Sequence, residues 1–186
     1  MTPVTTTRAT LEDLSKVDGK AELVGGRIVF MSPSGHLPIL VAGEIFVSLR
    51  AYAKQHVGIA YGDGLGYAIP ELPSGRQSFC PDASYHTGPL PANPMRFREG
   101  APVFAVEVRS ESDYGPSAEE EMAAKRADYF AAGTLVVWDV DPLAKTVKVY
   151  RPTNPENPKT YGLGDMAEAE PAVPGWRVAL VDVFAN

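Results

Sequence analysis

The stretch Pro102–Ser110, with the sequence PVFAVEVRS, decides the fold. Its run of β-branched, aromatic and small apolar residues is the most strand-like in the chain and predicts a central strand over 102–108. Glu107 lies inside this run, between Val106 and Val108. A carboxylate on the buried side of a strand costs several kcal/mol unless a partner compensates it. The partner could be a cation in an ion pair, a proton retained because of a raised pKa, or a metal ion.

Two further segments extend this strand into a sheet. SFCPDASYH (78–86) belongs to a strand that should enter at Gln77 and leave near His86, and TLVVWDVD (134–141) is another buried strand. The sheet is therefore expected to centre on 77–86, 103–109 and 135–140. With helices before and between these strands, the pattern predicts an α+β or mixed α/β domain, with a central mixed β-sheet flanked by helices.

The N-terminal third has clear local signals. Thr10 is a candidate N-cap with Asp13 three residues later, so a short helix should run to about Val17. Two strand-like runs around a Gly-Gly pair predict a hairpin over 21–31. Apolar residues spaced by three and four then predict an amphipathic helix over 36–56.

The second half repeats this alternation of helix and strand. Ser117 and Glu120 form a capping-box pattern at the start of a helix that Gly133 should end. The proline-rich segment 87–102 has no periodicity and is expected to be a surface loop, a candidate lid or binding loop. The C-terminal GWRVALVDVF (175–184) predicts a last strand and a helical turn.

Composition narrows the possible classes of protein. A chain of 186 residues suits one domain, 1–186, with its core at about 21–150. The net charge of −6 argues against a broad basic surface that coats nucleic acid. Cys80 is the one cysteine, so an internal disulfide is excluded, and we expect it to be a small buried residue. With no apolar run of 18 residues and no signal-peptide core in Met1–Leu14, we expect a cytoplasmic protein that does not span a membrane.

Asp82 and Glu107 are the acids most suited to chemistry. If their strands are neighbours, their carboxylates can converge at one end of the sheet, and hard oxygen ligands suit Mg²⁺ or Mn²⁺. Strand alternation places Arg109 on the same face as Glu107. A purely structural salt bridge between Glu107 and Arg109 is the competing interpretation.

Lys125 also has two interpretations. In the middle of a helix it is ordinarily exposed to solvent or paired with Glu121, four residues earlier. Alternatively it turns inward over the end of the central strand, where an ammonium could orient a water and stabilise negative charge on a phosphate.

Four segments in order resemble the Uma2 family, also called the DUF820 putative restriction endonucleases, of the PD-(D/E)xK nuclease-like superfamily. The segments are AELVGGRIVFMSPSGH (21–36), CPDAS (80–84), VFAVEVRSESD (103–113) and KRADYFAAGTLVVWDVDPLAKTVKVY (125–150). The resemblance covers about Ala21–Tyr150. It implies a restriction-endonuclease-like core and hydrolysis of phosphodiester bonds.

The resemblance also implies roles for individual residues. Asp82 matches the acid of the PD motif and Glu107 the second acid, and both would be ligands of Mg²⁺ or Mn²⁺. The lysine expected two residues after the second acid is Arg109 here. Lys125 matches a catalytic lysine that has moved to the following helix. Since a guanidinium stays charged, Arg109 can hold a phosphate but is not a general base.

Glu22 and His36 complete the set implied by the resemblance. Glu22 matches an acid near the site that assists metal or water binding, and His36 occupies a position usually held by histidine. For His36, a helix-start histidine that contacts the backbone is an equally good interpretation.

Two functions follow from this sequence. The first is a metal-dependent endonuclease that cleaves DNA, and a homodimer would supply two sites for two strands. The second is a catalytically silent relative that keeps the fold and binds nucleic acid or protein as a regulatory module. The acidic composition favours the second. A measurement of metal binding would distinguish the endonuclease from the silent relative.

Overall fold

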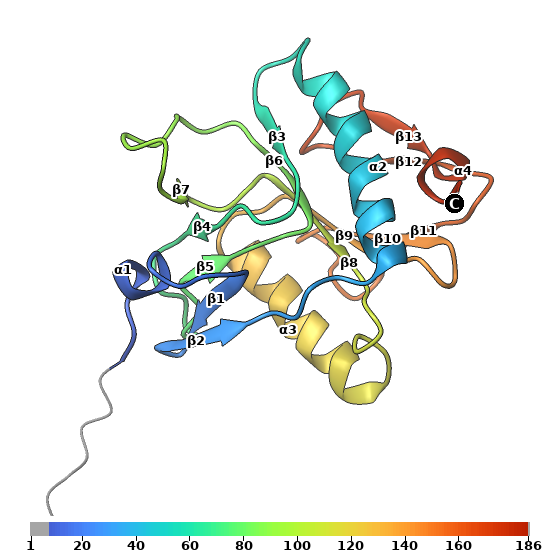
Figure 1. Cartoon of the computed structure of the whole chain (residues 1–186). Helices are drawn as coiled ribbons and strands as arrows, with labels where there is room; N and C mark the ends of the chain where they lie inside the picture. The colour runs from blue at the N-terminus through green and yellow to red at the C-terminus, as the bar shows by residue number, and fades with distance from the viewer. Residues whose placement is uncertain (1–7, 186) are drawn as a thin grey trace, which may run out of the picture.

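The structure is a computed structural model that describes residues 8–185 (Figure 1). The first seven residues, part of the N-terminal stretch expected to lack a signal-peptide core, lie outside the described residues, as does Asn186. The helices are α1 (Leu11–Leu14), α2 (His36–Ala53), α3 (Pro116–Ala131) and α4 (Leu180–Val183). The strands are β1 (Ala21–Val24), β2 (Arg27–Phe30), β3 (Ile59–Tyr61), β4 (Tyr67–Ala68), β5 (Ser78–Phe79), β6 (Ala83–His86), β7 (Arg98–Glu99), β8 (Phe104–Val108), β9 (Val136–Asp141), β10 (Thr146–Tyr150), β11 (Lys159–Tyr161), β12 (Met166–Glu168) and β13 (Arg177–Ala179).

A six-stranded mixed sheet forms the centre of the fold. Its strand order is β11-β10-β9-β8-β6-β3, so the predicted central strand β8 does lie in the interior, between β9 and β6. β8 pairs parallel with β9 and antiparallel with β6, while the outer strands pair antiparallel. Smaller sheets of β1-β2, β12-β13 and β5-β4-β7 surround it. The predicted α+β class with a central mixed sheet is confirmed.

Helices cover both faces of the sheet, and β8 shows why. Phe104, Val106 and Val108 point to one face and pack in the larger core with α2, α4 and the C-terminal segment. Ala105 points to the other face, into the smaller core on the α3 side. In Figure 1, α2 (cyan) and α3 (yellow) lie on opposite sides of the central strands. Strand alternation therefore places Glu107 on the face that α3 covers.

Helix α2 qualifies a prediction made from composition. Contrary to the expectation that no stretch is apolar enough, His36–Ala53 could cross a membrane by its length and composition alone. These two properties are weak grounds, because the core helix of a globular domain satisfies them too. Val41, Ile45 and Leu49, spaced by four, are fully buried against the sheet.

The N-terminal elements follow their local signals. Thr10 caps α1 and forms a capping box with Asp13, as predicted. The Gly25-Gly26 pair, with φ of 59° and 72°, makes the tight turn between β1 and β2, a left-handed conformation that glycine adopts without strain. β1 also lies against β5, and this contact holds Glu22 over the α3 face of the central sheet.

The predicted strand over 77–86 is wrong in one respect, because it is two strands in different sheets. β5 pairs with β4, and β6 pairs with β3 and β8, with Cys80, Pro81 and Asp82 between them. Pro81 has no N–H to donate to a ladder, so the chain changes sheets at this point. Cys80 is buried, as expected.

Other details of the elements also differ from prediction, since α1 ends at Leu14 and α2 at Ala53, each three residues before its expected end. Gly115 is the N-cap of α3, Pro116 is its first residue, and Ser117 lies inside the helix, so the predicted capping box does not form. Proline suits the first helical turn, where its missing N–H would have no partner. The expected loop over 87–102 contains β7, which pairs parallel with β4. β11 and β12 were not predicted.

Candidate active site

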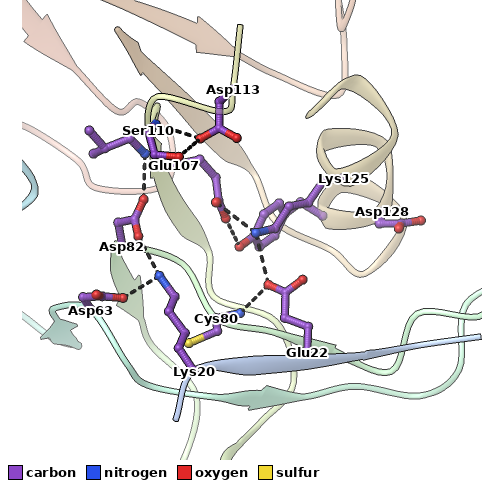
Figure 2. Close-up of polar contacts among 12 residues, drawn as sticks. Lys20, Glu22, Asp63, Cys80, Asp82, Glu107, Ser110, Asp113, Lys125 and Asp128 are labelled. Atoms are coloured by element: carbon purple, nitrogen blue, oxygen red, sulfur yellow. Dashed lines mark hydrogen bonds and ion pairs between the residues drawn. The ribbon is translucent and has the colours of Figure 1, made fainter. Parts of the chain in front are cut away.

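A cavity of about 650 Å³ lies between the β1-β2 hairpin, the start of β6 with the end of β8, and one side of α3. Its lining includes Lys20, Glu22, Asp82, Glu107, Lys125 and Tyr129. These residues come from four separate segments of the chain, and the close-up in Figure 2 shows the side chains of all of them except Tyr129, which it does not label, converging. Of the six residues singled out from the sequence, the structure therefore brings four together, and a fifth, Arg109, lines the same cavity with other partners.

Glu107 has an ion-pair partner from α3. Lys125 donates to Glu107 Oε2 at 2.9 Å, and the Tyr129 hydroxyl donates to Oε1 at 2.6 Å. Lys125 and Tyr129 are four residues apart, so they project from the same face of the helix. The inward orientation of Lys125 is confirmed, and the exposed pairing with Glu121 is not observed. The strand carboxylate is thus compensated by a cation and a hydroxyl donor.

Glu22 is a deeply buried acid of the cavity, with a side chain 6% exposed. Its Oε1 accepts from the Cys80 backbone N–H at 2.9 Å and forms an ion pair with Lys125 at 3.1 Å. Its Oε2 accepts from Arg76, whose Nε also pairs with Asp128 at 2.8 Å. Lys125 therefore bridges an acid on β1 and an acid on β8, and it ties the hairpin to the central sheet.

Asp82 approaches Glu107 from the position directly before β6, the strand that pairs with β8. Its backbone N–H donates to Val106 O at 3.0 Å, and its Oδ2 accepts from the Val108 N–H at 2.8 Å. Its Oδ1 receives the ammonium of Lys20 at 2.7 Å. The same ammonium lies 2.6 Å from Asp63 Oδ1, in the loop between β3 and β4.

Burial and neighbouring charges change the acidity of this cluster. Burial raises the pKa of Glu107, and the nearby carboxylates of Asp82 and Glu22 raise it further, against the lowering effect of Lys125. Burial alone would lower the pKa of Lys125, but Glu107 and Glu22 raise it well above its usual range. Lys125 is accordingly a permanent cation here, suited to holding an anion rather than accepting a proton.

Arg109 is not part of this cluster, although it lines the cavity. Its guanidinium binds Asp139 through Nε and Nη2, each at 2.8 Å, and it also pairs with Glu119. The expected salt bridge with Glu107 is therefore wrong. The reason is that β9 places Asp139 directly beside Glu107 in the parallel register, and Arg109 binds Asp139 instead of Glu107.

His36 is likewise outside the cavity. It is the exposed first residue of α2, and it does not line the cavity. The sequence alternative, a helix-start histidine that contacts the backbone, gives its position correctly, but among residues 8–185 the His36 ring makes no hydrogen bond to the backbone.

The donor set suits a hard divalent cation with retained waters. No group of three or more His, Cys, Asp or Glu side chains poised to hold a metal occurs within residues 8–185. Mg²⁺, however, commonly uses one or two carboxylates and completes its coordination with water and substrate phosphate. Asp82, directly before β6, and Glu107, on the adjacent strand β8, line one cavity and supply such a pair of oxygen ligands.

Sequence reasoning missed Lys20, Asp63, Arg76 and the role of Tyr129. Tyr129 had a usable signal, because its spacing of four from Lys125 puts both on one helix face. Lys20 also had one, since it lies two residues before Glu22 and strand alternation gives both the same side. Asp63 and Arg76 lie in loops, where no periodicity indicates direction.

Comparisons with known proteins identify the fold and the family of the chain. A crystal structure of "a putative nuclease belonging to DUF820" from Anabaena variabilis ATCC 29413 superimposes with a TM-score of 0.74 at 19% identity, covering 95% of this chain and 97% of that chain. At that identity, the likeness establishes the fold. No curated protein matches the chain. The sequence model of the Uma2 family, described as "Putative restriction endonuclease", matches residues 9–181. The chain therefore belongs to the Uma2 family.

Proposed function

We propose that this protein is a metal-dependent endonuclease of the PD-(D/E)xK type that hydrolyses phosphodiester bonds in DNA. The observation that carries the proposal is the position of Lys125, whose ammonium lies 2.9 Å from Glu107 in the cavity that Asp82 also lines. Two acids at one end of a pair of adjacent strands, with a lysine beside them, are the parts that metal-assisted phosphodiester hydrolysis needs. Family membership supports a nucleic acid as substrate.

Asp82 and Glu107 would hold the cation, Mg²⁺ or Mn²⁺. When bound, such an ion supplies Lewis-acid stabilisation of a phosphate and lowers the pKa of a water ligand. The Val108 N–H fixes one oxygen of Asp82, and the Tyr129 hydroxyl fixes one oxygen of Glu107. Each acid thus keeps one anchored oxygen and turns the other toward an ammonium.

Lys125 contributes charge and direction. Because Glu22 and Glu107 hold its ammonium from two sides, its position is defined before substrate arrives. A preorganised cation stabilises negative charge that develops on a phosphate with little reorganisation. Arg109 cannot replace it, since Asp139 and Glu119 already occupy its guanidinium.

One observation favours the silent binding module instead. Both oxygens of Asp82 and both of Glu107 already have a donor within hydrogen-bond distance. Coordination of a cation therefore requires at least one donor on each acid to move. In a protein that binds no metal, these donors would stay on Asp82 and Glu107.

Plasmid cleavage tests the proposal. Purified wild-type protein should nick supercoiled plasmid in the presence of Mg²⁺ or Mn²⁺ and lose this activity with EDTA. Asp82→Asn, Glu107→Gln and Lys125→Met should each abolish nicking. Glu156→Gln, at an exposed acid outside this cavity, is the matched control and should cleave like wild type. Equal cleavage by Asp82→Asn and wild type would contradict the proposal.

Metal titration separates the silent module from the nuclease. A cation that binds only the folded protein must raise its melting temperature. We expect a calorimetric signal and a higher melting temperature with Mn²⁺, and both should disappear in Asp82→Asn. The absence of both in wild type would favour the silent module.

A further inference from the structure

Lys20 is a cation of the cavity to which neither the sequence nor the family resemblance gave a role. Its ammonium lies between two carboxylates, 2.6 Å from Asp63 Oδ1 and 2.7 Å from Asp82 Oδ1 (Figure 2). The Lys20 side chain is 19% exposed, and the Asp82 side chain is 14% exposed. An ammonium shielded to this degree interacts with its partners more strongly than a surface lysine does.

Lys20 contacts Oδ1 of Asp82, the oxygen that a metal would have to bind. Asp82 Oδ2 is held by the Val108 N–H, an interaction within the framework of β8. Oδ1 is the oxygen left for another ligand, and Lys20 occupies it. Lys20 precedes β1, and its carbonyl accepts from the Met31 N–H, so the backbone of this lysine is held in the hairpin. The ammonium is thus a built-in cation at the site.

Lys20 parallels Lys125 in its contacts. Each lysine bridges one expected metal ligand and one further acid: Asp82 and Asp63 for Lys20, Glu107 and Glu22 for Lys125. Burial alone would lower the pKa of Lys20, but Asp82 and Asp63 raise it well above its usual range.

The formal charge of the groups linked by ion pairs is −2, which one divalent ion would neutralise. The acids are Glu22, Asp63, Asp82, Glu107 and Asp128, and the cations joined to them are Lys20, Arg76 and Lys125. Three positive charges against five negative ones leave −2. Removing one lysine charge would therefore make the cavity more attractive to a cation.

We propose that Lys20 is a positioning residue that occupies the metal-facing oxygen of Asp82 and must give up this contact when a divalent cation binds, while Asp63 keeps the displaced ammonium beside the cavity. Lys20 thereby lowers the affinity of the site for metal. The inference rests on the proposed function, because it assumes that Asp82 is a metal ligand. It extends that function by assigning Lys20 and Asp63 a role in metal entry.

Mn²⁺ affinity, measured by electron paramagnetic resonance of the free ion and by calorimetry, tests this role without any activity assay. Lys20→Met should bind Mn²⁺ about tenfold more tightly than wild type, within the range that directly coupled charged groups show. Lys20→Arg keeps the charge and should remain close to wild type. Lys54→Met removes an exposed lysine at the end of α2 and is the matched control.

Asp63→Asn provides a second variant with the opposite expectation. Without Asp63, the ammonium pairs with Asp82 alone, so Mn²⁺ should bind more weakly than in wild type. Far-UV circular dichroism and melting curves establish that each variant folds. If Lys20→Met does not fold, the weaker binding of Asp63→Asn still tests the proposal, and unchanged binding there would overturn it.

The outcomes separate this inference from the proposed function. Tighter binding by Lys20→Met, including binding that appears only in this variant, supports the role of Lys20. Equal or weaker binding by a folded Lys20→Met, with clear binding by wild type, overturns the role and leaves the metal site intact. No Mn²⁺ binding by either protein overturns both.

Discussion

Replacing Lys125 by methionine should destabilise the metal-free protein far more than replacing an exposed lysine. The ammonium bridges Glu107 and Glu22 at 2.9 and 3.1 Å, with the Lys125 and Glu107 side chains 20% and 22% exposed. Glu22 would keep Arg76 as its counter-ion, whereas Glu107 would keep only the Tyr129 hydroxyl. Most of the stability lost in Lys125→Met therefore comes from the uncompensated carboxylate of Glu107.

The magnitude follows from this burial. Removing one partner of a fully buried ion pair costs about 3–5 kcal/mol. Because about a fifth of each side chain is exposed, solvent screening reduces this to roughly 2–4 kcal/mol. For a domain of this size, each kcal/mol lowers the melting temperature by about 2–4 °C, so Lys125→Met should melt about 5–15 °C below wild type.

A double-mutant cycle in EDTA measures the pair directly. Glu107→Gln removes the orphaned charge, so the double variant should be more stable than the sum of the two single losses predicts, by about 1–2 kcal/mol. Urea denaturation followed by circular dichroism gives the four free energies of unfolding. Lys54→Met should stay within about 0.5 kcal/mol of wild type. Strict additivity, or a Lys125→Met loss equal to that of Lys54→Met, would refute the reasoning.

Two other residues give independent predictions. Arg109→Met should lower the free energy of unfolding by roughly 3 kcal/mol in urea denaturation, because it leaves the buried Asp139 without its bidentate partner. A loss below about 0.5 kcal/mol, which is typical of a surface position, would contradict a structural role for Arg109. Burial and the neighbouring Arg98 lower the pKa of His86 in the folded protein, so stability is complete above the unfolded value of about 6.5 and falls as the pH drops below it. Urea denaturation at neutral and mildly acidic pH should show this loss in wild type and a smaller one in His86→Asn, and equal losses would contradict the assignment.

The central strand and its neighbours could be predicted from local patterns. The PVFAVEV run (102–108) predicts a buried strand by itself, and the alternation within it places Glu107 on the face opposite to Val106 and Val108. The same logic failed for 77–86, where apolar character continues across Pro81 although the chain passes from one sheet to another. Continuity of hydrophobicity does not specify which strand a segment pairs with.

Side-chain partners were harder to predict than elements. Glu107 and Arg109 share a face, but the arginine binds Asp139, which belongs to a strand 30 residues later. Lys20 and Asp82 are 62 residues apart and meet only because the β1-β2 hairpin folds over the sheet. Such contacts depend on how elements pack, and sequence spacing carries no information on this. The resemblance to a family supplied the inward Lys125 where spacing left two choices.

The most direct test of the account is a crystal structure of the protein soaked with Mn²⁺. The account predicts an anomalous peak bound by carboxylate oxygens of both Asp82 and Glu107, with the Lys20 ammonium withdrawn from Asp82. Saturating Mn²⁺ with no peak between these two acids, and with Lys20 still on Asp82, would contradict the claim that this cavity is a metal site.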